Sequence, residues 1–310
     1  MVSNGEPILL ASDLALEEAV IACSGGRRLH SWRLSPPCGG KSGIVVLAPG
    51  FGQTMTHLST LALYLASAGF VVYRYDPFNH IGLSSGSVRS FTMSSSLESM
   101  QIVVRSILAQ DLGSSQIGLV ASSLAARVAY RMVAVEPSLS FLITIAGVVN
   151  LRDTLVQVLG TDWFEVNSKE LPETIEVEGY PITAPPFCGD CVSEDWLSLE
   201  STKREIRTMK TRLTAFTASE DLWVRYEDSV EAHRSLLHPS SKNILLAGAT
   251  HNSSNNPRTT RVLLNAVTDG ALDAVAVGKR NGGEPTFSTI VASALTERRL
   301  FRRRFAEASQ

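Results

Sequence analysis

Residues 117 to 127 read Ile117-Gly118-Leu119-Val120-Ala121-Ser122-Ser123-Leu124-Ala125-Ala126-Arg127. The first half is a short apolar run typical of a buried strand, and the second half has the composition of a helix. Ser123 has small residues two places before and two places after it, whereas Ser122 has larger residues at both places. A tight passage from strand to helix requires small residues there. The segment therefore predicts a sharp strand–serine–helix turn centred on Ser123.

Short apolar runs alternate with longer helical patterns on both sides of this turn. Such alternation predicts a mostly parallel central sheet flanked by helices, with an antiparallel pair at its start. We expect strands at 19–23, 29–34, 43–48, 70–76, 117–122, 141–147, 213–218 and 243–248. We expect helices near 56–67, 94–109, 124–134, 227–237 and 259–275, and again after 278.

The stretch from 150 to 207 interrupts the alternation. It is acidic, contains four prolines and separates two expected sheet strands. A long excursion of this kind is usually functional or disordered rather than a plain connection. We interpret it as a cap inserted into a core formed by residues 1–149 and 208–310.

A serine on such a turn becomes a nucleophile when a base and an acid lie beside it. The acid and then the histidine follow the serine along the chain, each after a sheet strand. Asp221 follows the expected strand 213–218, and His251 follows the expected strand 243–248. The imidazole takes the hydroxyl proton, and the carboxylate orients the imidazole and stabilises its protonated form. We therefore predict an α/β-hydrolase fold with Ser123, Asp221 and His251 as its catalytic triad.

Each of these residues also has an ordinary structural explanation. Ser123 alone would cap the helix that follows it, Asp221 alone would be a turn aspartate, and His251 alone a loop histidine. Glu220, beside Asp221, and Asp76, after an earlier strand, remain alternatives for the acid. The order of serine, acid and histidine favours the catalytic interpretation.

The loop after strand 43–48 reads Pro49-Gly50-Phe51-Gly52. In this fold, one backbone N–H of that loop and the N–H after the nucleophile stabilise the oxyanion of the reaction. We predict Phe51 and Leu124 as these donors. Ser84 and Ser85, after strand 70–76, are candidates for lining the substrate site, with a plain polar loop as the equal alternative.

Bulk composition narrows the function classes. The 310 residues are 44% hydrophobic and 19% charged, which is typical of a globular chain with a large core. The net charge of −2 provides no basic field for nucleic-acid binding. No apolar run reaches the roughly 18 residues of a spanning helix, and the start lacks a signal-peptide pattern. We expect a cytoplasmic protein with no membrane span and no nucleic-acid partner.

The four cysteines are too few and too scattered for a disulfide scaffold: Cys23, Cys38, Cys188 and Cys191. The last two have the spacing of half a zinc or redox site, but no second pair completes the site. We expect neither a metal nor another cofactor.

Several segments together resemble a known family, and they extend over nearly the whole chain. They are Gly50-Phe51, Arg74-Tyr75-Asp76, 79–87, Phe91-Thr92-Met93, 121–130, 141–144, 147–153, 215–218 and 297–300. In them the chain resembles the acyl-transferase family of bacterial bioluminescence operons, the myristoyl-carrier-protein-specific thioesterases. The resemblance implies the same triad. It also implies cleavage of a long-chain acyl thioester, on acyl carrier protein or coenzyme A, through an acyl-serine enzyme.

The resemblance also implies an acyl-accepting synthetase or reductase as a partner. The chain departs from the family pattern between 161 and 202, in the cap. We expect the cap to form the slot for the acyl chain, with Leu155 and Val158 among its lining residues. Two alternatives remain. One is an off-loading thioesterase or cyclase of a natural-product pathway, and the other is a hydrolase-fold protein that binds a ligand without turnover, which an intact triad disfavours.

Overall fold

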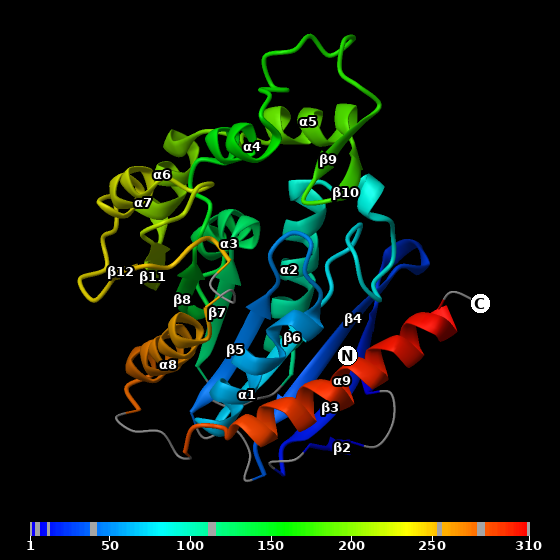
Figure 1. Ribbon diagram of the computed structural model, residues 1–310, viewed down its shortest axis with the longest axis vertical. Coiled ribbons are helices and arrows are strands. Elements are labelled where there is room, and N and C mark those ends of the chain that lie inside the picture. The colour runs from blue at the N-terminus through cyan, green and yellow to red at the C-terminus, as the bar shows by residue number, and fades with distance from the viewer. Residues whose placement is uncertain are drawn as a thin grey trace.

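A ten-stranded sheet organises the fold, in the order β1-β3-β4-β6-β5-β7-β8-β11-β12 with β2 paired to β3 (Figure 1). The computed structural model describes residues 2–3, 7–10, 13–37, 42–110, 116–252, 256–277 and 283–308. Cys38 lies outside these ranges. Within them, no helix combines the length and the apolar character that crossing a bilayer requires.

The sheet has an antiparallel beginning and a parallel remainder. The antiparallel strands are β1 (Val2–Ser3), β2 (Ile8–Leu9), β3 (Ala15–Ala22) and β4 (Arg28–Ser35). The parallel strands are β5 (Gly43–Ala48), β6 (Phe70–Tyr75), β7 (Ile117–Ser122), β8 (Leu139–Ile145), β11 (Arg212–Ala218) and β12 (Lys242–Leu246). Every predicted strand is present, so the predicted fold class is confirmed.

Two hydrophobic cores lie on opposite faces of the sheet, and alternate residues of each central strand enter them. In β5, Ile44 and Val46 face one core, and Val45 and Leu47 face the other. All residues of β5 and β6 are buried, as expected for parallel strands covered on both sides. In β7, a side chain at Gly118 would overlap the ring of Phe141 on the next strand.

Helices cover both faces (Figure 1). The first core is covered by α2 (Met93–Leu108), α3 (Leu124–Val135) and α7 (Tyr226–His233). The second is covered by α1 (Ser59–Ser67), α8 (Pro257–Ala274) and α9 (Phe287–Ala308). Short 3-10 turns are η1 (Ser24–Gly26), η2 (Met55–Leu58) and η3 (Val88–Ser90). These helices match the predicted positions, including the one expected after residue 278.

The segment that we interpret as the cap has its own small architecture. It contains α4 (Leu151–Leu159), the hairpin β9 (Thr174–Val177) and β10 (Tyr180–Thr183), α5 (Ala184–Ser193) and α6 (Leu199–Thr208). Two prolines stand in the first turn of α5, where a missing N–H does no harm. The hairpin and α5 lie beyond the carboxyl ends of the parallel strands (Figure 1).

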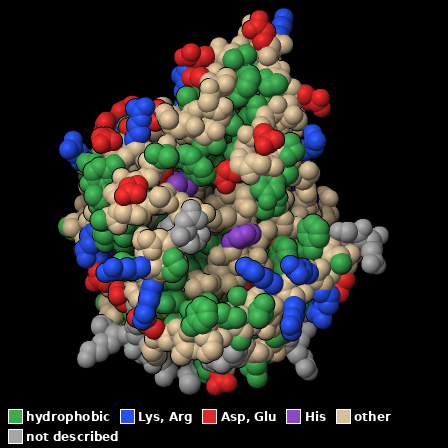
Figure 2. All heavy atoms as spheres, viewed as in Figure 1, with side chains coloured by type: hydrophobic (Ala, Val, Ile, Leu, Met, Phe, Trp, Pro, Cys, Tyr) green, Lys and Arg blue, Asp and Glu red, His purple; other side chains and the backbone are tan. Residues whose placement is uncertain are grey.

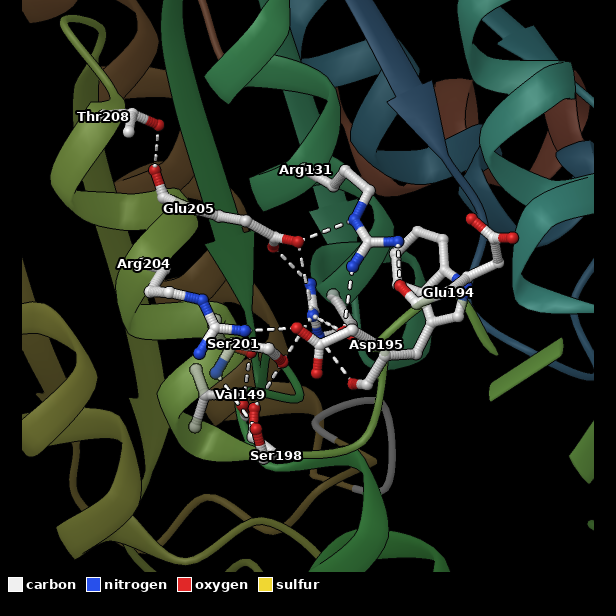
Figure 3. Close-up of polar contacts among 12 residues, drawn as sticks. Arg131, Val149, Glu194, Asp195, Ser198, Ser201, Arg204, Glu205 and Thr208 are labelled. Carbon is white, nitrogen blue, oxygen red and sulfur yellow. Dashed lines mark hydrogen bonds and ion pairs between the residues drawn. The ribbon is translucent and has the colours of Figure 1, made fainter. Parts of the chain in front are cut away.

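Two clusters around buried arginines attach distant segments to the core. In the cluster that we call the cap clamp, Arg127 of α3 pairs with Glu205 of α6 and donates to the Trp196 carbonyl at 3.0 Å. Arg131 stacks 3.5 Å from the centroid of the Trp196 ring and pairs with Glu205 at 2.6 Å. Figure 3 shows Arg131 and Glu205 pointing toward one another across this contact.

In the second cluster, the α9 clamp, Arg74 of β6 forms two hydrogen bonds of 2.9 Å to the Glu297 carboxylate. Both side chains are fully buried. Ser59, at the start of α1, also contacts Glu297 and accepts from Arg74 at 3.1 Å. The clamp thereby joins α9 to the sheet and to α1.

Candidate active site

Ser123 occupies the turn between β7 and α3 in a strained conformation, with φ 51° and ψ −125°. Residues other than glycine rarely adopt such angles, and holding one there costs on the order of 1–3 kcal/mol. The Ser123 N–H donates to the Ile145 carbonyl at 3.0 Å, and its carbonyl accepts from Val148 at 3.1 Å. These bonds fix the turn so that the hydroxyl projects beyond the end of the sheet.

A continuous chain of hydrogen bonds joins the three predicted catalytic residues. The Ser123 hydroxyl lies 2.8 Å from His251 Nε2, and His251 Nδ1 lies 2.7 Å from Asp221 Oδ2. The other oxygen of Asp221 accepts from the N–H groups of Trp223 and Val224, at 2.9 and 3.0 Å. The Asp221 side chain is only 2% exposed, so this carboxylate is fixed on both sides.

The competing candidates lie elsewhere. Asp76 is buried at the end of β6, where it accepts from the N–H groups of Met55 and Leu83 at 2.7 and 2.8 Å. Burial raises the pKa of Asp76 to about 7. Glu220 is exposed, and the buried Ser122 hydroxyl has no hydrogen-bond partner within the described ranges. The structure therefore brings together Ser123, Asp221 and His251 and keeps the alternatives out of the hydrogen-bond chain.

The loop after β5 passes close to the serine, because a Cβ at Gly50 would lie 3.3 Å from the Cβ of Ser123. Gly50 N–H donates to the Gln53 side chain, and Gly52 N–H donates to His80 Nε2 at 3.2 Å. The N–H groups of Phe51 and Leu124 have no acceptor among the described residues. They are the two amides predicted as oxyanion donors.

His80 is a residue that sequence reasoning passed over, because it precedes the serine in the chain. Burial lowers the pKa of His80 to about 4, so the ring is neutral and its Nε2 accepts the Gly52 N–H. Its ring also packs edge-on against Phe51, with centroids 5.2 Å apart. His80 therefore positions the loop that carries the Phe51 amide.

A cavity of about 310 Å³ opens beside the serine. Its polar lining includes Ser123, Gln53, Glu178 and His251. Trp223 packs on the His251 ring with centroids 4.5 Å apart. Its apolar lining comes from η2, the end of β8, α1 and α8, through Leu58, Leu61, Ile145, Leu263, Leu264 and Val267. Figure 2 shows histidine side chains reaching the surface in the middle of this face, where the molecule is hollowed beneath the cap.

The other predicted lining residues lie outside this cavity. The hydroxyls of Ser84 and Ser85 accept from backbone N–H groups of β4 at 2.9 Å and fasten their loop to that strand. Leu155 is buried in the α2/α3 core, and Val158 packs against it. The cavity lies between α1 and α8, whereas α4 packs on the opposite face of the sheet. The apolar pattern of α4 gave no indication of this location.

Cys188 and Cys191 lie one turn apart on α5, and both are buried. Burial raises the pKa of the Cys188 thiol to about 11 and also raises that of Cys191. A thiol that stays protonated is a poor nucleophile and a poor metal ligand. Over the described parts of the chain, no three His, Cys, Asp or Glu side chains gather as a metal site.

Known proteins are similar to this chain in sequence and in fold. Residues 16–304 match the acyl transferase family. The acyl transferase of Photobacterium phosphoreum is 36% identical over 286 residues, which cover 91% of this chain and 93% of that protein. That of Vibrio harveyi is 36% identical over 292 residues, with the same coverage.

Among solved structures, Est1E from Butyrivibrio proteoclasticus with bound ferulic acid superposes with a TM-score of 0.69 at 18% identity, over 83% of this chain and 99% of that one. The α/β hydrolase GrgF from a Penicillium species superposes with a TM-score of 0.63 at 16% identity, over 84% and 99%. These structures share the fold alone with this chain. The sequence match, in contrast, spans nearly its whole length, and the protein therefore belongs to the acyl transferase family.

Proposed function

We propose that this protein is a serine-dependent acyltransferase or thioesterase that removes a long-chain acyl group from a thioester through an acyl-enzyme on Ser123. The observation that carries the proposal is the hydrogen-bond chain from Ser123 through His251 to Asp221, which ends at a mostly apolar cavity. Membership of the acyl transferase family supports the reaction class. The resemblance to carrier-protein-specific thioesterases supports acyl carrier protein or coenzyme A as the donor, and a synthetase or reductase as a partner.

In the acylation step, Ser123 Oγ attacks the thioester carbonyl while His251 Nε2 takes the hydroxyl proton. Asp221 accepts the Nδ1–H bond and stabilises the imidazolium. The N–H groups of Phe51 and Leu124 bind the oxyanion, each contributing about 3 kcal/mol to transition-state stabilisation. His251 then gives its proton to the departing thiolate, which leaves as a thiol.

In the second step, an acceptor with an O–H, N–H or S–H group enters the position that the thiol has left. His251 takes the acceptor's proton as the acceptor attacks the acyl-serine carbonyl, and then returns that proton to Ser123 Oγ. Water as the acceptor gives hydrolysis, and any other acceptor gives acyl transfer.

The acyl chain is proposed to lie between α1 and α8. Burial of each methylene contributes roughly 0.8 kcal/mol, so an apolar wall strengthens binding as the chain lengthens until the cavity is full. Leu61 and Leu264 face the cavity from the two helices. This placement differs from our expectation that the cap forms the slot.

Covalent labelling tests the nucleophile. The Ser123→Ala variant should lose all labelling by a fluorophosphonate or an acyl thioester, and Ser122→Ala should keep it. Asp221→Asn should lower turnover by orders of magnitude, while Asp76→Asn should keep the label even if it is less stable. If Ser122→Ala loses the label and Ser123→Ala keeps it, the nucleophile is Ser122 and not Ser123.

Acyl-length profiles test the binding site. Leu264→Phe narrows the cavity, so the preferred acyl length should fall by several carbons while short esters are still cleaved. Val158→Phe, on α4 of the cap, is the matched control and should leave the profile unchanged. A profile that shifts with Val158→Phe but not with Leu264→Phe would return the acyl chain to the cap.

A further inference from the structure

The tip of the β9–β10 hairpin brings a carboxylate into the catalytic cavity. Of the described residues that line this cavity with Ser123 and His251, Glu178 is the only acidic one. Its backbone is left-handed, with φ 48°, followed by Gly179 at φ 80°. Asparagine, aspartate and glycine are the usual residues in such a two-residue turn, and a glutamate there is unfavourable. The backbone at Glu178 is therefore strained, and this strained conformation places the Glu178 side chain at the cavity. Such strain points to a role for Glu178 beyond forming the turn.

The carboxylate of Glu178 sits beside the proposed oxyanion site. A Cβ at Gly52 would lie 3.2 Å from Glu178 Oε2, so this oxygen lies near the loop that carries the Phe51 amide. Tyr180, at the far side of the turn, packs edge-on against Phe51 with centroids 6.2 Å apart. The hairpin tip is thus docked on the oxyanion loop.

Nothing in the described structure neutralises Glu178 by direct contact. Among the described residues, the charge of His251 is the only group that acts on this carboxylate, and it does so without a hydrogen bond or ion pair. Glu178 remains exposed to solvent as a residue. Partial desolvation of its carboxyl raises the pKa of Glu178, and a protonated His251 opposes that shift. The charge therefore faces the space that a bound acyl group would fill.

We propose that Glu178 is a specificity-determining residue that admits neutral acyl groups to the cavity and drives out carboxylate products. This inference rests on the proposed function and adds to it the charge selectivity of the same site. A thioester or ester carbonyl is uncharged, so the Glu178 carboxylate does not oppose its entry. A fatty acid released by hydrolysis ionises to a carboxylate beside the oxyanion donors, where a second negative charge repels it.

The charge of Glu178 should change the energy of the transition states much less than it changes the energy of the bound product. Each combines a negative oxyanion with a positive imidazolium on His251, so the reacting groups are neutral as a whole. The product complex combines a carboxylate with a neutral imidazole and carries a net negative charge. Glu178 therefore lowers affinity for the product without a matching loss in the rate of acyl transfer.

The test compares binding of decanoate with binding of decanamide, a neutral molecule of almost the same shape, at pH 8 by calorimetry. The wild-type protein should bind decanamide more tightly than decanoate. Glu178→Gln should shift the ratio of the two Kd values in favour of decanoate by about tenfold. Glu178→Asp keeps the charge and should keep much of the discrimination. Glu176→Gln, on the same hairpin but outside the cavity lining, should not change the discrimination.

The outcomes separate this inference from the proposed function. If Glu178→Gln changes both Kd values by the same factor, the charge does not select ligands and the inference is wrong. If decanamide binds to no variant, the cavity is not the acyl site and the inference fails with it. If Ser123 proves not to be acylated while the ratio shifts as expected, the charge selectivity stands and the proposed reaction falls.

Discussion

The α9 clamp and the cap clamp use the same device, a buried arginine on a core element, to hold a distant segment, yet they differ in how the charge is compensated. Arg74 pairs with the fully buried carboxylate of Glu297 and also donates to the Met55 carbonyl and the Ser59 hydroxyl. Arg127 pairs with Glu205, which is 14% exposed, and also donates to the carbonyl of Trp196 and the hydroxyl of Ser201. The two clamps therefore differ in the exposure of the carboxylate partner, and water reaches Glu205 but not Glu297. Loss of a carboxylate charge should cost less where water already screens it.

The two clamps also differ in their relation to the cavity. Arg74 donates to the carbonyl of Met55, the first residue of η2, and η2 supplies His57 and Leu58 to the cavity wall. No residue of the cap clamp lines the cavity. Substitutions in the α9 clamp should therefore lower both the stability of the fold and the rate of turnover. Substitutions in the cap clamp should lower mainly the stability.

The largest effect is expected from Glu297→Gln, which leaves the Arg74 guanidinium buried without a counter-charge. Removing one partner of a buried pair costs about 3–5 kcal/mol in the free energy of unfolding. Urea denaturation should show this loss, with lower turnover of a short ester. Arg299→Gln, exposed on the same helix, should stay within about 0.5 kcal/mol of the wild type.

Replacing both partners, Arg74→Met with Glu297→Leu, should recover much of the lost stability, because no uncompensated charge remains. A single Glu297→Gln variant as stable as the wild type would show that the α9 clamp does not depend on its ion pair.

A smaller loss is expected at the cap clamp. Glu205→Gln removes the charge partner of Arg127 but leaves the Trp196 and Ser201 acceptors, and Glu205 is partly solvated. We expect a loss of about 1–2 kcal/mol by urea denaturation, with turnover of a short ester unchanged. Glu200→Gln, exposed on the same helix, is the matched control. A loss equal to that of Glu297→Gln would remove the contrast between the clamps.

The two sides of the molecule also differ in the pH dependence of their stability. On the cap side, burial lowers the pKa of His233 on α7 to about 4, and its Nε2 lies 3.2 Å from the Tyr130 hydroxyl. The unfolded chain binds a proton at this histidine below about pH 6.5, whereas the folded chain does not. The contribution of His233 to the free energy of unfolding is therefore fully present above pH 6.5. It falls toward pH 4 by at most about 1.4 kcal/mol per pH unit.

On the side of the predicted catalytic residues, two buried groups have opposite effects on the pH dependence of stability. His80, with its pKa lowered to about 4, also loses stability as the pH falls from 6.5. Asp76, with its pKa raised by burial to about 7, has the opposite sign, because its contribution is present below about pH 4 and is lost as the pH rises toward 7. His233→Gln should therefore flatten the stability profile between pH 7 and 5, and Asp76→Asn should steepen it. An unchanged slope in both variants would contradict these assignments.

Local sequence signals predicted much of the fold and of the candidate site. The small residues around Ser123 indicated the turn, and two later strands placed Asp221 and His251 after their carboxyl ends. Parallel strands end at the same edge, so chain order was enough to predict their proximity. His80 precedes the serine, so chain order gives no reason to select it, and its contact with Gly52 depends on how two loops fold over one another.

The sequence by itself determined the alternation of strands and helices, the sharp turn at Ser123, and the chain order of the three predicted catalytic residues, because each depends on neighbours along the chain or on periodicity. Only the tertiary structure decided that the cavity lies between α1 and α8, that Arg74 meets Glu297 across 223 positions of sequence, and that Glu178 enters the cavity from the cap. An apolar stripe shows that a helix faces the interior, but it does not show which part of the interior stays empty. That depends on how all the surrounding elements pack at once, and on which distant side chain reaches the space they leave.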